Sequence, residues 1–321
     1  MAKAGGKVIL AGEHAVVYGA PAVAVGLTHG VTAQAQPAED ARLSVAGQPA
    51  EPDSEAARAF QRVLAVLHAK PHEAHVELNM PAGVGLGASA AMGVALARAV
   101  LEAQGETEST YDPRVLEAAA AWEEVFHGSP SGIDAACAFS GGCIRFDKQR
   151  GWQRVRPKVA FDLAIAVAGP ATSTRTMVEE VAKLRARNVT LFEQGVEAIR
   201  TLARNAELCL TSGDLMGLGR LMNYNQMLLS AWFVSSPEIE FACSVARGEG
   251  AFGAKLTGAG GGGCVVALTA AGESESVLSA WRDAGLTCLS NPVRPGGGTR
   301  SGAGGSPVQA HRRPNRTKGS R

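Results

Sequence analysis

Aromatic residues make up only 5% of the 321-residue chain, so alanine, valine, leucine and glycine must fill its core. It has no apolar run long enough to form a membrane-spanning helix. A secretory signal is not expected either, because Gly12, Glu13 and His14 interrupt the first apolar segment. Its six cysteines show neither CxxC nor zinc-ligand spacing. We therefore expect buried free thiols, a cytoplasmic location and no membrane partner.

Acidic residues are absent from residues 290–321, which carry seven lysines and arginines. A basic tail is compatible with nucleic-acid binding. This one, however, has no aromatic residue on which a base could stack. Its richness in glycine, proline, serine and asparagine favours a disordered tail instead. We therefore expect no nucleic-acid partner.

Apolar periodicity predicts an α+β chain in which strands and helices alternate without a long repeat. Helices are predicted over residues 55–69, 89–104, 113–128, 174–188, 189–209, 214–232 and 273–283. Strands are predicted over residues 6–10, 31–36, 42–45, 74–80, 142–146, 161–169, 254–256 and 263–269, and a last one begins at 285. The polar, basic segment 147–160 predicts a domain boundary, which gives domains 1–152 and 153–289 before the tail.

The glycine-rich stretch PAGVGLGASAA, residues 81–91, lies between a predicted strand and a predicted helix. Gly83, Gly85 and Gly87 allow a tight turn and a close approach of the backbone to a ligand. The first turn of the helix that follows has unpaired N–H groups and a partial positive charge, so the unit can bind a phosphate group. No Lys-Ser or Lys-Thr follows, which excludes a Walker loop. An ordinary glycine-rich turn remains the alternative.

Three further stretches contain polar groups or glycines in unexpected places. In GKVILAGEHAVVYG, residues 6–19, the Glu13-His14 pair lies in an apolar region. Because burying these groups without a partner is costly, they either pair with each other or face a polar cleft. In KLTGAGGGGCVVAL, residues 255–268, five glycines exceed what a hairpin needs. That backbone can close over a phosphate or a small substrate, or form a flexible hairpin.

In EEVFHGSPSGIDAA, residues 123–136, Glu123 and Glu124 occupy the last turn of a predicted helix. The helix dipole disfavours negative charge there. Glu123 therefore indicates a nearby cation, whereas Glu124 is expected to be solvated. Asp134 begins a run of small apolar residues, which predicts either a functional carboxylate or a helix cap.

Taken in order over about residues 4–288, these four stretches resemble one superfamily of small-molecule kinases. It unites galactokinase, homoserine kinase, mevalonate kinase and phosphomevalonate kinase. GEHAVVYG and HGxPSGID are most similar to the mevalonate kinase family. The resemblance implies an N-terminal mixed-sheet ATP domain and a C-terminal ferredoxin-like domain. It further implies phosphorylation of mevalonate by ATP, and it is compatible with a homodimer.

The resemblance also assigns roles to individual residues. Asp134 matches the acid that faces the substrate hydroxyl, and Lys7 matches the lysine beside it. Ser89 and Glu123 match the ligands of Mg²⁺, whose preference for oxygen suits them. The nucleotide loop comprises Pro81, Gly83, Gly85, Leu86, Gly87, Ala88, Ser89 and Ala90. The substrate pocket comprises Glu13, His14, Thr174, Gly258 and Ala259.

The chain departs from the family at three places. Gly5 replaces a proline before Gly6-Lys7, which loosens the entry to the strand but leaves the chemistry unchanged. Ala88 replaces the first serine of the nucleotide loop, so we expect activity with weaker nucleotide contacts. The tail, residues 290–321, matches nothing in the family. A phosphomevalonate kinase remains an alternative, although it needs more basic residues than Lys7 in these motifs. A non-catalytic ligand sensor is a remoter alternative.

Overall fold

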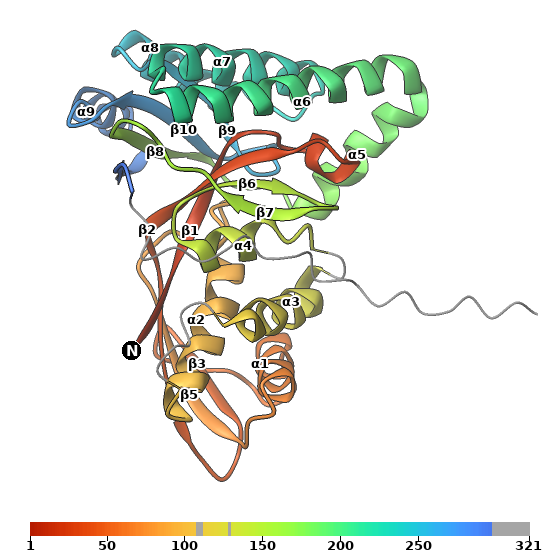
Figure 1. Cartoon of the computed structure of the whole chain (residues 1–321), viewed down its shortest axis with the longest axis vertical. Helices are drawn as coiled ribbons and strands as arrows, with labels where there is room; N and C mark the ends of the chain where they lie inside the picture. Colours follow the sequence, from red (N-terminus) through yellow and green to blue (C-terminus); the bar gives the residue numbers. More distant parts are fainter. Residues whose placement is uncertain (107–111, 128–129, 297–321) are drawn as a thin grey trace, which may run out of the picture.

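The computed structural model describes residues 1–106, 112–127 and 130–296 of an α+β chain with two sheets (Figure 1). The strands are β1 (Ala2–Ala11), β2 (Ala22–Pro37), β3 (Arg42–Val45), β4 (Gln48–Pro49), β5 (His72–Leu78), β6 (Cys143–Asp147), β7 (Gly151–Arg154), β8 (Phe161–Gly169), β9 (Gly253–Thr257), β10 (Gly263–Ala270) and β11 (Thr287–Val293). The helices are the 3₁₀ turn η1 (Ala15–Tyr18), α1 (Glu55–Val66), α2 (Ala88–Ala103), α3 (Pro113–His127), α4 (Ile133–Ser140), α5 (Thr174–Arg187), α6 (Val189–Ser212), α7 (Leu215–Ala231), α8 (Pro237–Gly248) and α9 (Glu275–Asp283).

The first sheet is mixed, as the resemblance implied. Its strands follow the order β4-β3-β5-β2-β6-β7, and β1 pairs with β2. Only the β3–β5 pairing among these is parallel. Helices α1 to α4 contribute to its core, which is built from small and branched side chains. Helix α1 forms where the sequence predicts it, because Ser54 caps its start and Phe60, Val63 and Leu64 are buried on one face.

The second sheet is antiparallel and follows the order β11-β8-β10-β9. Helices α5 to α8 connect β8 to β9, and α9 connects β10 to β11. In chain order the strands therefore lie fourth, first, third, second, which is the arrangement of a βαββαβ ferredoxin-like unit. The expected C-terminal architecture is confirmed.

The two sheets meet through a shared apolar core. Val8 and Leu10 of β1 belong to the same buried cluster as Leu163 of β8, Val266 of β10 and Met222 of α7. Figure 1 shows β1 and β2 running from the lower part of the molecule, beside α2 and β5, up to the second sheet. The strand that carries Lys7 is thus packed between both halves. The change of sheet falls between β7 and β8, while the division into domains at residue 152 stays a prediction.

Several boundaries differ from those predicted. β2 is one continuous strand, whereas the sequence predicted only residues 31–36, because its first half is apolar on both faces and lacks alternation. Helix α4 was not predicted because it is short. Helix α8 was overlooked despite a Ser-Pro-Glu start, in which Ser236 caps the helix and a proline follows.

The end of the chain also requires a correction. β11 continues to Val293, so residues 290–293 belong to the second sheet rather than to the tail. Asn291 is 1% exposed, and its side chain accepts hydrogen bonds from the backbone N–H and the hydroxyl group of Thr28. The predicted disorder of residues 297–321 and the predicted helix end at Gly128 lie outside the described residues.

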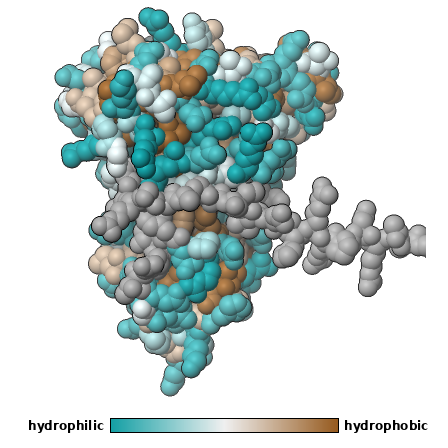
Figure 2. All heavy atoms as spheres, in the orientation of Figure 1, coloured by the Kyte–Doolittle hydropathy of each residue, from teal (hydrophilic) through white to brown (hydrophobic). Residues whose placement is uncertain are grey.

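All six cysteines, which lie in the described ranges, are free thiols as expected. Four are buried, and burial raises the pKa of Cys143, Cys243 and Cys264 to about 12. Within the described ranges, no helix is both long and apolar enough to cross a membrane. Figure 2 shows a mostly hydrophilic face that carries scattered apolar patches.

Candidate active site

Lys7 and Asp134 lie side by side although they are far apart in the sequence. Lys7 Nζ lies 3.5 Å from Asp134 Oδ1 and donates a hydrogen bond of 2.8 Å to Gly85 O. The backbone N–H of Lys7 donates to Leu86 O, which fixes β1 against the glycine loop. The Lys7 side chain is 4% exposed and that of Asp134 is 35% exposed. The Lys7 ammonium is therefore buried against the glycine loop, while the Asp134 carboxylate is partly exposed to solvent.

Asp134 is not a helix cap. The N-cap of α4 is Gly132, which has a left-handed φ of 86°, and no side chain caps this end. Asp134 occupies the first turn of α4, where the helix dipole favours a negative charge. Of the two alternatives raised by the sequence, the structure thus excludes the cap.

The loop before α2 has the geometry of a phosphate site. Gly83, Gly85 and Gly87 all have positive φ, at 73°, 87° and 77°. Helix α2 begins at Ala88, its first turn has no acidic residue, and no side chain caps it. Its first backbone N–H groups are therefore available to an anion. The other predicted members of the loop, which are Pro81, Leu86, Ser89 and Ala90, lie in or directly after the same turn.

Gly87 brings this loop against the Lys7–Asp134 pair. A Cβ atom at Gly87 would lie 3.2 Å from Lys7 Cγ and 3.7 Å from Asp134 Cγ. The positive φ of Gly87 adds strain for any other residue. The glycine therefore serves both the turn and the close approach to the charged pair.

Ser89 and Glu123 form the second polar pair of the site. Ser89 Oγ donates a hydrogen bond to Glu123 Oε1. Burial raises the pKa of Glu123, and the nearby Asp134 carboxylate raises it further, whereas the Ser89 hydrogen bond and His127 act in the opposite direction. His127 Nε2 lies 4.0 Å from Glu123 Oε2. A buried carboxylate beside a second carboxylate is a place where a bound cation would be favourable.

These oxygen groups suit Mg²⁺. Among the described residues there is no cluster of three or more His, Cys, Asp or Glu side chains able to hold a metal alone. Mg²⁺ typically takes one or two protein oxygens and completes its shell with water and substrate phosphates. Ser89 and Glu123 beside a phosphate loop fit that pattern. Glu124, by contrast, is exposed and lies 3.4 Å from Arg62, in line with the expectation that it is solvated.

Glu13 follows neither alternative derived from the sequence. It does not pair with His14, and at 1% exposure it does not open to a cleft, whereas the His14 side chain keeps 5% exposure. Glu13 Oε1 accepts a hydrogen bond from Lys255 on β9. His14 Nε2 lies 2.8 Å from Ala259 O in the loop after β9. Both partners come from the second half of the chain, which local reasoning could not reach.

The glycines that follow β9 lie against the glycine loop of residues 81–91. A Cβ atom at Gly258 would lie 3.2 Å from Gly85 O, and one at Gly263 would lie 3.0 Å from Val84 O. Two glycine loops more than 160 residues apart in sequence therefore touch, and the flexible hairpin considered above is a packed element. Ala259, next to Gly258, contributes its carbonyl oxygen to His14.

Thr174 is the least connected of the predicted residues. It is the first residue of α5 and is exposed. In the described part of the chain, no hydrogen bond or ion pair joins Thr174 to the other predicted site residues. The segment before it is anchored, because Thr172 Oγ1 donates a hydrogen bond of 2.7 Å to Gly261 O. α5 therefore begins at the edge of the third glycine loop.

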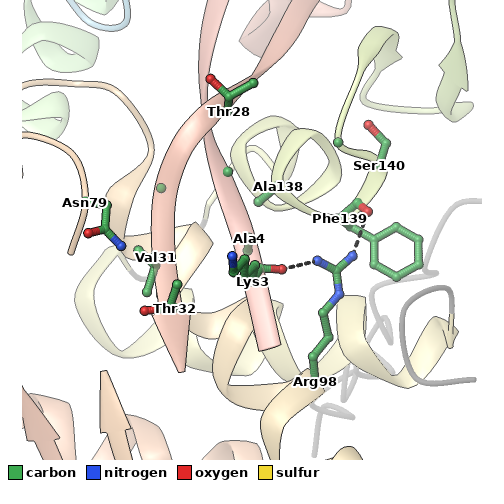
Figure 3. A pocket seen from close by; sticks show the side chains of 13 residues that line it. Lys3, Ala4, Thr28, Val31, Thr32, Asn79, Arg98, Ala138, Phe139 and Ser140 are labelled. Carbon is green, nitrogen blue, oxygen red and sulfur yellow. Dashed lines mark hydrogen bonds between the residues drawn. The ribbon is translucent and has the colours of Figure 1, made fainter. Parts of the chain in front are cut away.

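Sequence reasoning missed two buried cations that support the site. Lys255 is the first residue of the glycine-rich stretch 255–268, and no role was predicted for it. Arg98, in the middle of α2, donates to Lys3 O at 2.6 Å and to Phe139 O at 2.8 Å (Figure 3). It thereby joins the helix of Ser89 to the strand of Lys7 and to the end of α4. The available signal was a cation flanked by apolar residues inside a strand or helix.

Arg98 also lines a hollow of about 410 Å³ between β1, β2, α2 and α4 (Figure 3). None of the predicted site residues lines it. The hollow is therefore separate from the Lys7–Asp134 site.

Comparisons with known proteins agree with this arrangement. The family model described as GHMP kinases N terminal domain matches residues 54–142, and the one described as GHMP kinases C terminal matches residues 199–286. A mevalonate kinase of Methanothermobacter thermautotrophicus is 35% identical over 275 residues, which are 83% of this chain and 89% of the relative. A mevalonate kinase of Aeropyrum pernix is 35% identical over 86% of this chain and 90% of its own length.

A solved structure shares both fold and sequence with this chain. The crystal structure of L. major mevalonate kinase in complex with R-mevalonate has a TM-score of 0.82 at 28% identity. The match covers 91% of this chain and 95% of that one. Matches on this scale, together with the two family domains, show that the chain belongs to the mevalonate kinase family of the GHMP kinases.

Proposed function

We propose that this chain transfers the γ-phosphoryl group of ATP to the 5-hydroxyl group of mevalonate, giving 5-phosphomevalonate and ADP. The observation that carries the proposal is the Lys7–Asp134 pair, which lies directly beside Gly87 at the start of α2. A carboxylate, a cation and an uncapped helix start at one place are what phosphoryl transfer to a hydroxyl group requires. The relatives named mevalonate kinase support the choice of substrate.

In this proposal Asp134 accepts the proton of the substrate hydroxyl as the new O–P bond forms. Its partial exposure makes it reachable by a substrate. Lys7 cannot move freely, because one of its N–H groups is already given to Gly85 O. The remaining positive charge stabilises negative charge that develops on the attacking oxygen and on the transferring group.

The phosphates of ATP bind the N–H groups at the start of α2. Ser89 and Glu123 would hold Mg²⁺, which would supply neutralisation of charge on the phosphate groups. The raised pKa of Glu123 in the unliganded chain shows that burial disfavours its ionised form there, so a bound cation and an ionised Glu123 favour each other.

His14 orients mevalonate through a defined ring nitrogen. Ala259 O can only accept, so His14 Nε2 must carry the hydrogen atom of their contact. Burial lowers the pKa of His14, which keeps the ring neutral near pH 7. In a neutral ring protonated at Nε2, Nδ1 is an acceptor. It therefore accepts a hydrogen bond from a mevalonate hydroxyl, while Thr174 and the loop of Gly258 and Ala259 close the pocket.

A phosphomevalonate kinase is less well supported, because a second phosphate group needs unengaged cations. Lys7 faces Asp134, and the buried Lys255 faces Glu13. The six free thiols support a cytoplasmic enzyme. A homodimer stays a prediction.

The test is ADP release with mevalonate, phosphomevalonate, homoserine or galactose in the presence of ATP and Mg²⁺. We expect turnover with mevalonate alone. Turnover with one of the other three would replace the substrate assignment. Binding of ATP without turnover on any of them would indicate the non-catalytic sensor.

A further inference from the structure

Lys255 is a buried cation that the proposed chemistry does not use. It lies on β9 and is 0% exposed. Its ammonium donates to Ile9 O, to Leu256 O and to Glu13 Oε1. An ammonium has three N–H groups, so each has an acceptor within the protein. Lys255 therefore has no donor left for a phosphate or a substrate, although it lies at the edge of the third glycine stretch.

Glu13 is equally enclosed. Its Oε1 atom accepts from Lys255, and its Oε2 atom is buried with no partner among the described residues. Burial raises the pKa of Glu13 and lowers that of Lys255, and the attraction between the two charges opposes both shifts. Removing one member alone would leave an uncompensated buried charge.

The turn that contains Glu13 is held at each of three consecutive residues by the second half of the chain. The Gly12 N–H donates to Asn225 Oδ1 at 3.1 Å, Glu13 pairs with Lys255, and His14 bonds Ala259 O. His14 has a φ of 59°, which a residue with a side chain adopts only when its surroundings hold it there. The strained backbone of His14 therefore depends on these contacts.

Strand β9 and the loop directly after it supply the contacts of both Glu13 and His14. β9 presents Lys255 to Glu13, and the loop that begins at Gly258 presents Ala259 to His14. Between them, Thr257 Oγ1 accepts a hydrogen bond of 2.8 Å from the Ile9 N–H. A shift of β9 relative to β1 would consequently move His14 and the glycine loop together.

We propose that Lys255 is a positioning residue that acts through Glu13 to hold His14 and the 258–263 loop in the mevalonate-binding arrangement. Glu13 is then the buried partner of Lys255 and not a ligand of the substrate. This inference rests on the proposed function, because it assumes that His14 borders the substrate pocket. It predicts that the ion pair affects mevalonate binding more than ATP binding, since the 258–263 loop approaches the other glycine loop at Val84 and Gly85, before the N–H groups at the start of α2.

The test compares Lys255→Met, Glu13→Gln and the double variant. For Lys255→Met we expect a Tm lower by roughly 5–15 °C. Well below that Tm, its KM for mevalonate rises about tenfold or more, while its KM for ATP changes less than about twofold. The double variant should recover most of both losses, because it removes the second buried charge as well. Val277→Ala is the control, since it lowers Tm by opening a cavity under α9 and should leave both KM values unchanged.

The possible results separate clearly. A double variant with a KM for mevalonate as high as that of the worse single variant would make Glu13 a direct ligand and overturn the inference. A fall in Tm with unchanged KM values would reduce the pair to a stability element, as would failure of every variant to fold. If only the double variant folds, its KM for mevalonate decides, since a value near that of the wild type supports the inference and a value about tenfold higher overturns it. If the wild type phosphorylates a different alcohol, the proposed function fails, and the same KM comparison made with that alcohol still decides the role of Lys255.

Discussion

Lys7 Nζ lies 3.5 Å from Asp134 Oδ1, and the two residues come from different elements, β1 and α4. The pair is held by a third element, because Lys7 also donates to Gly85 O in the glycine loop before α2. One ammonium group therefore contacts both the Asp134 carboxylate and this glycine loop. The carboxylate and the loop can be tested separately by substitution, since a side chain carries the first role and backbone groups carry the second.

Asp134→Asn should lower turnover by about 10²- to 10⁴-fold, because the amide cannot accept the hydroxyl proton. Nucleotide affinity should stay within about threefold, since backbone N–H groups form the phosphate site. ADP release and titration with a fluorescent nucleotide measure the two effects. Asp147→Asn, at the end of β6, is the matched control, because its carboxylate accepts hydrogen bonds only from the backbone of the turn that follows. Near-normal turnover of Asp134→Asn would remove this residue from the chemistry.

Glu123→Gln should stabilise the unliganded chain at pH 7.5 while reducing Mg²⁺-dependent turnover. The folded-state pKa of Glu123 is raised, so the folded chain holds its proton more tightly than the unfolded chain. The resulting stability is complete below the unfolded value of about 4.5 and is lost as the pH rises through the folded value. Glutamine removes that loss, so Tm should rise by about 2–5 °C at pH 7.5, and the gain should shrink towards pH 4.5.

The matched control is Glu124→Gln on the same helix, where the carboxylate is exposed. Because it replaces an exposed side chain, it should change Tm by less than about 2 °C. Thermal melts from pH 4.5 to 8 without nucleotide, together with turnover as a function of Mg²⁺ concentration, decide the matter. A lower Tm for Glu123→Gln at pH 7.5 would contradict the inference that burial disfavours the ionised form of Glu123.

Sequence reasoning reached those parts of the site whose chemistry is local. The glycines of residues 81–87 predict a turn before a helix, whereas the role of Ser89 was predicted only through the family resemblance. Lys255 and Arg98 were missed because their partners come from distant segments, so their burial cannot be read from neighbouring residues. The two alternatives offered for Glu13 failed for the same reason, since the true partner lies 242 residues away.

Ala88→Ser tests whether the missing hydroxyl group weakens nucleotide binding. Ala88 is the first residue of α2 and is 8% exposed, so a hydroxyl there would lie at the phosphate-binding end. One additional hydrogen bond should lower the KM for ATP by about 2- to 10-fold without changing kcat. Ala103→Ser is the control, because Ala103 lies at the opposite end of the same helix. An unchanged KM for ATP would show that the hydroxyl is not used.

Truncation separates the last strand from the basic tail. A chain ending at Val293 should keep its Tm and its turnover with mevalonate, because β11 remains complete. A chain ending at Leu289 loses residues 290–293 of β11, including Asn291, which leaves the Thr28 N–H without its acceptor in the protein. Asn291→Ala removes that contact alone. It should lower the free energy of unfolding by about 1–3 kcal/mol, and Tm by roughly 2–8 °C. Thermal melts of the three proteins measure these differences.

Equal Tm values for the chains ending at Leu289 and Val293 would contradict the role of β11 in joining the two sheets. A loss of turnover in the chain ending at Val293 would instead assign a function to the basic tail.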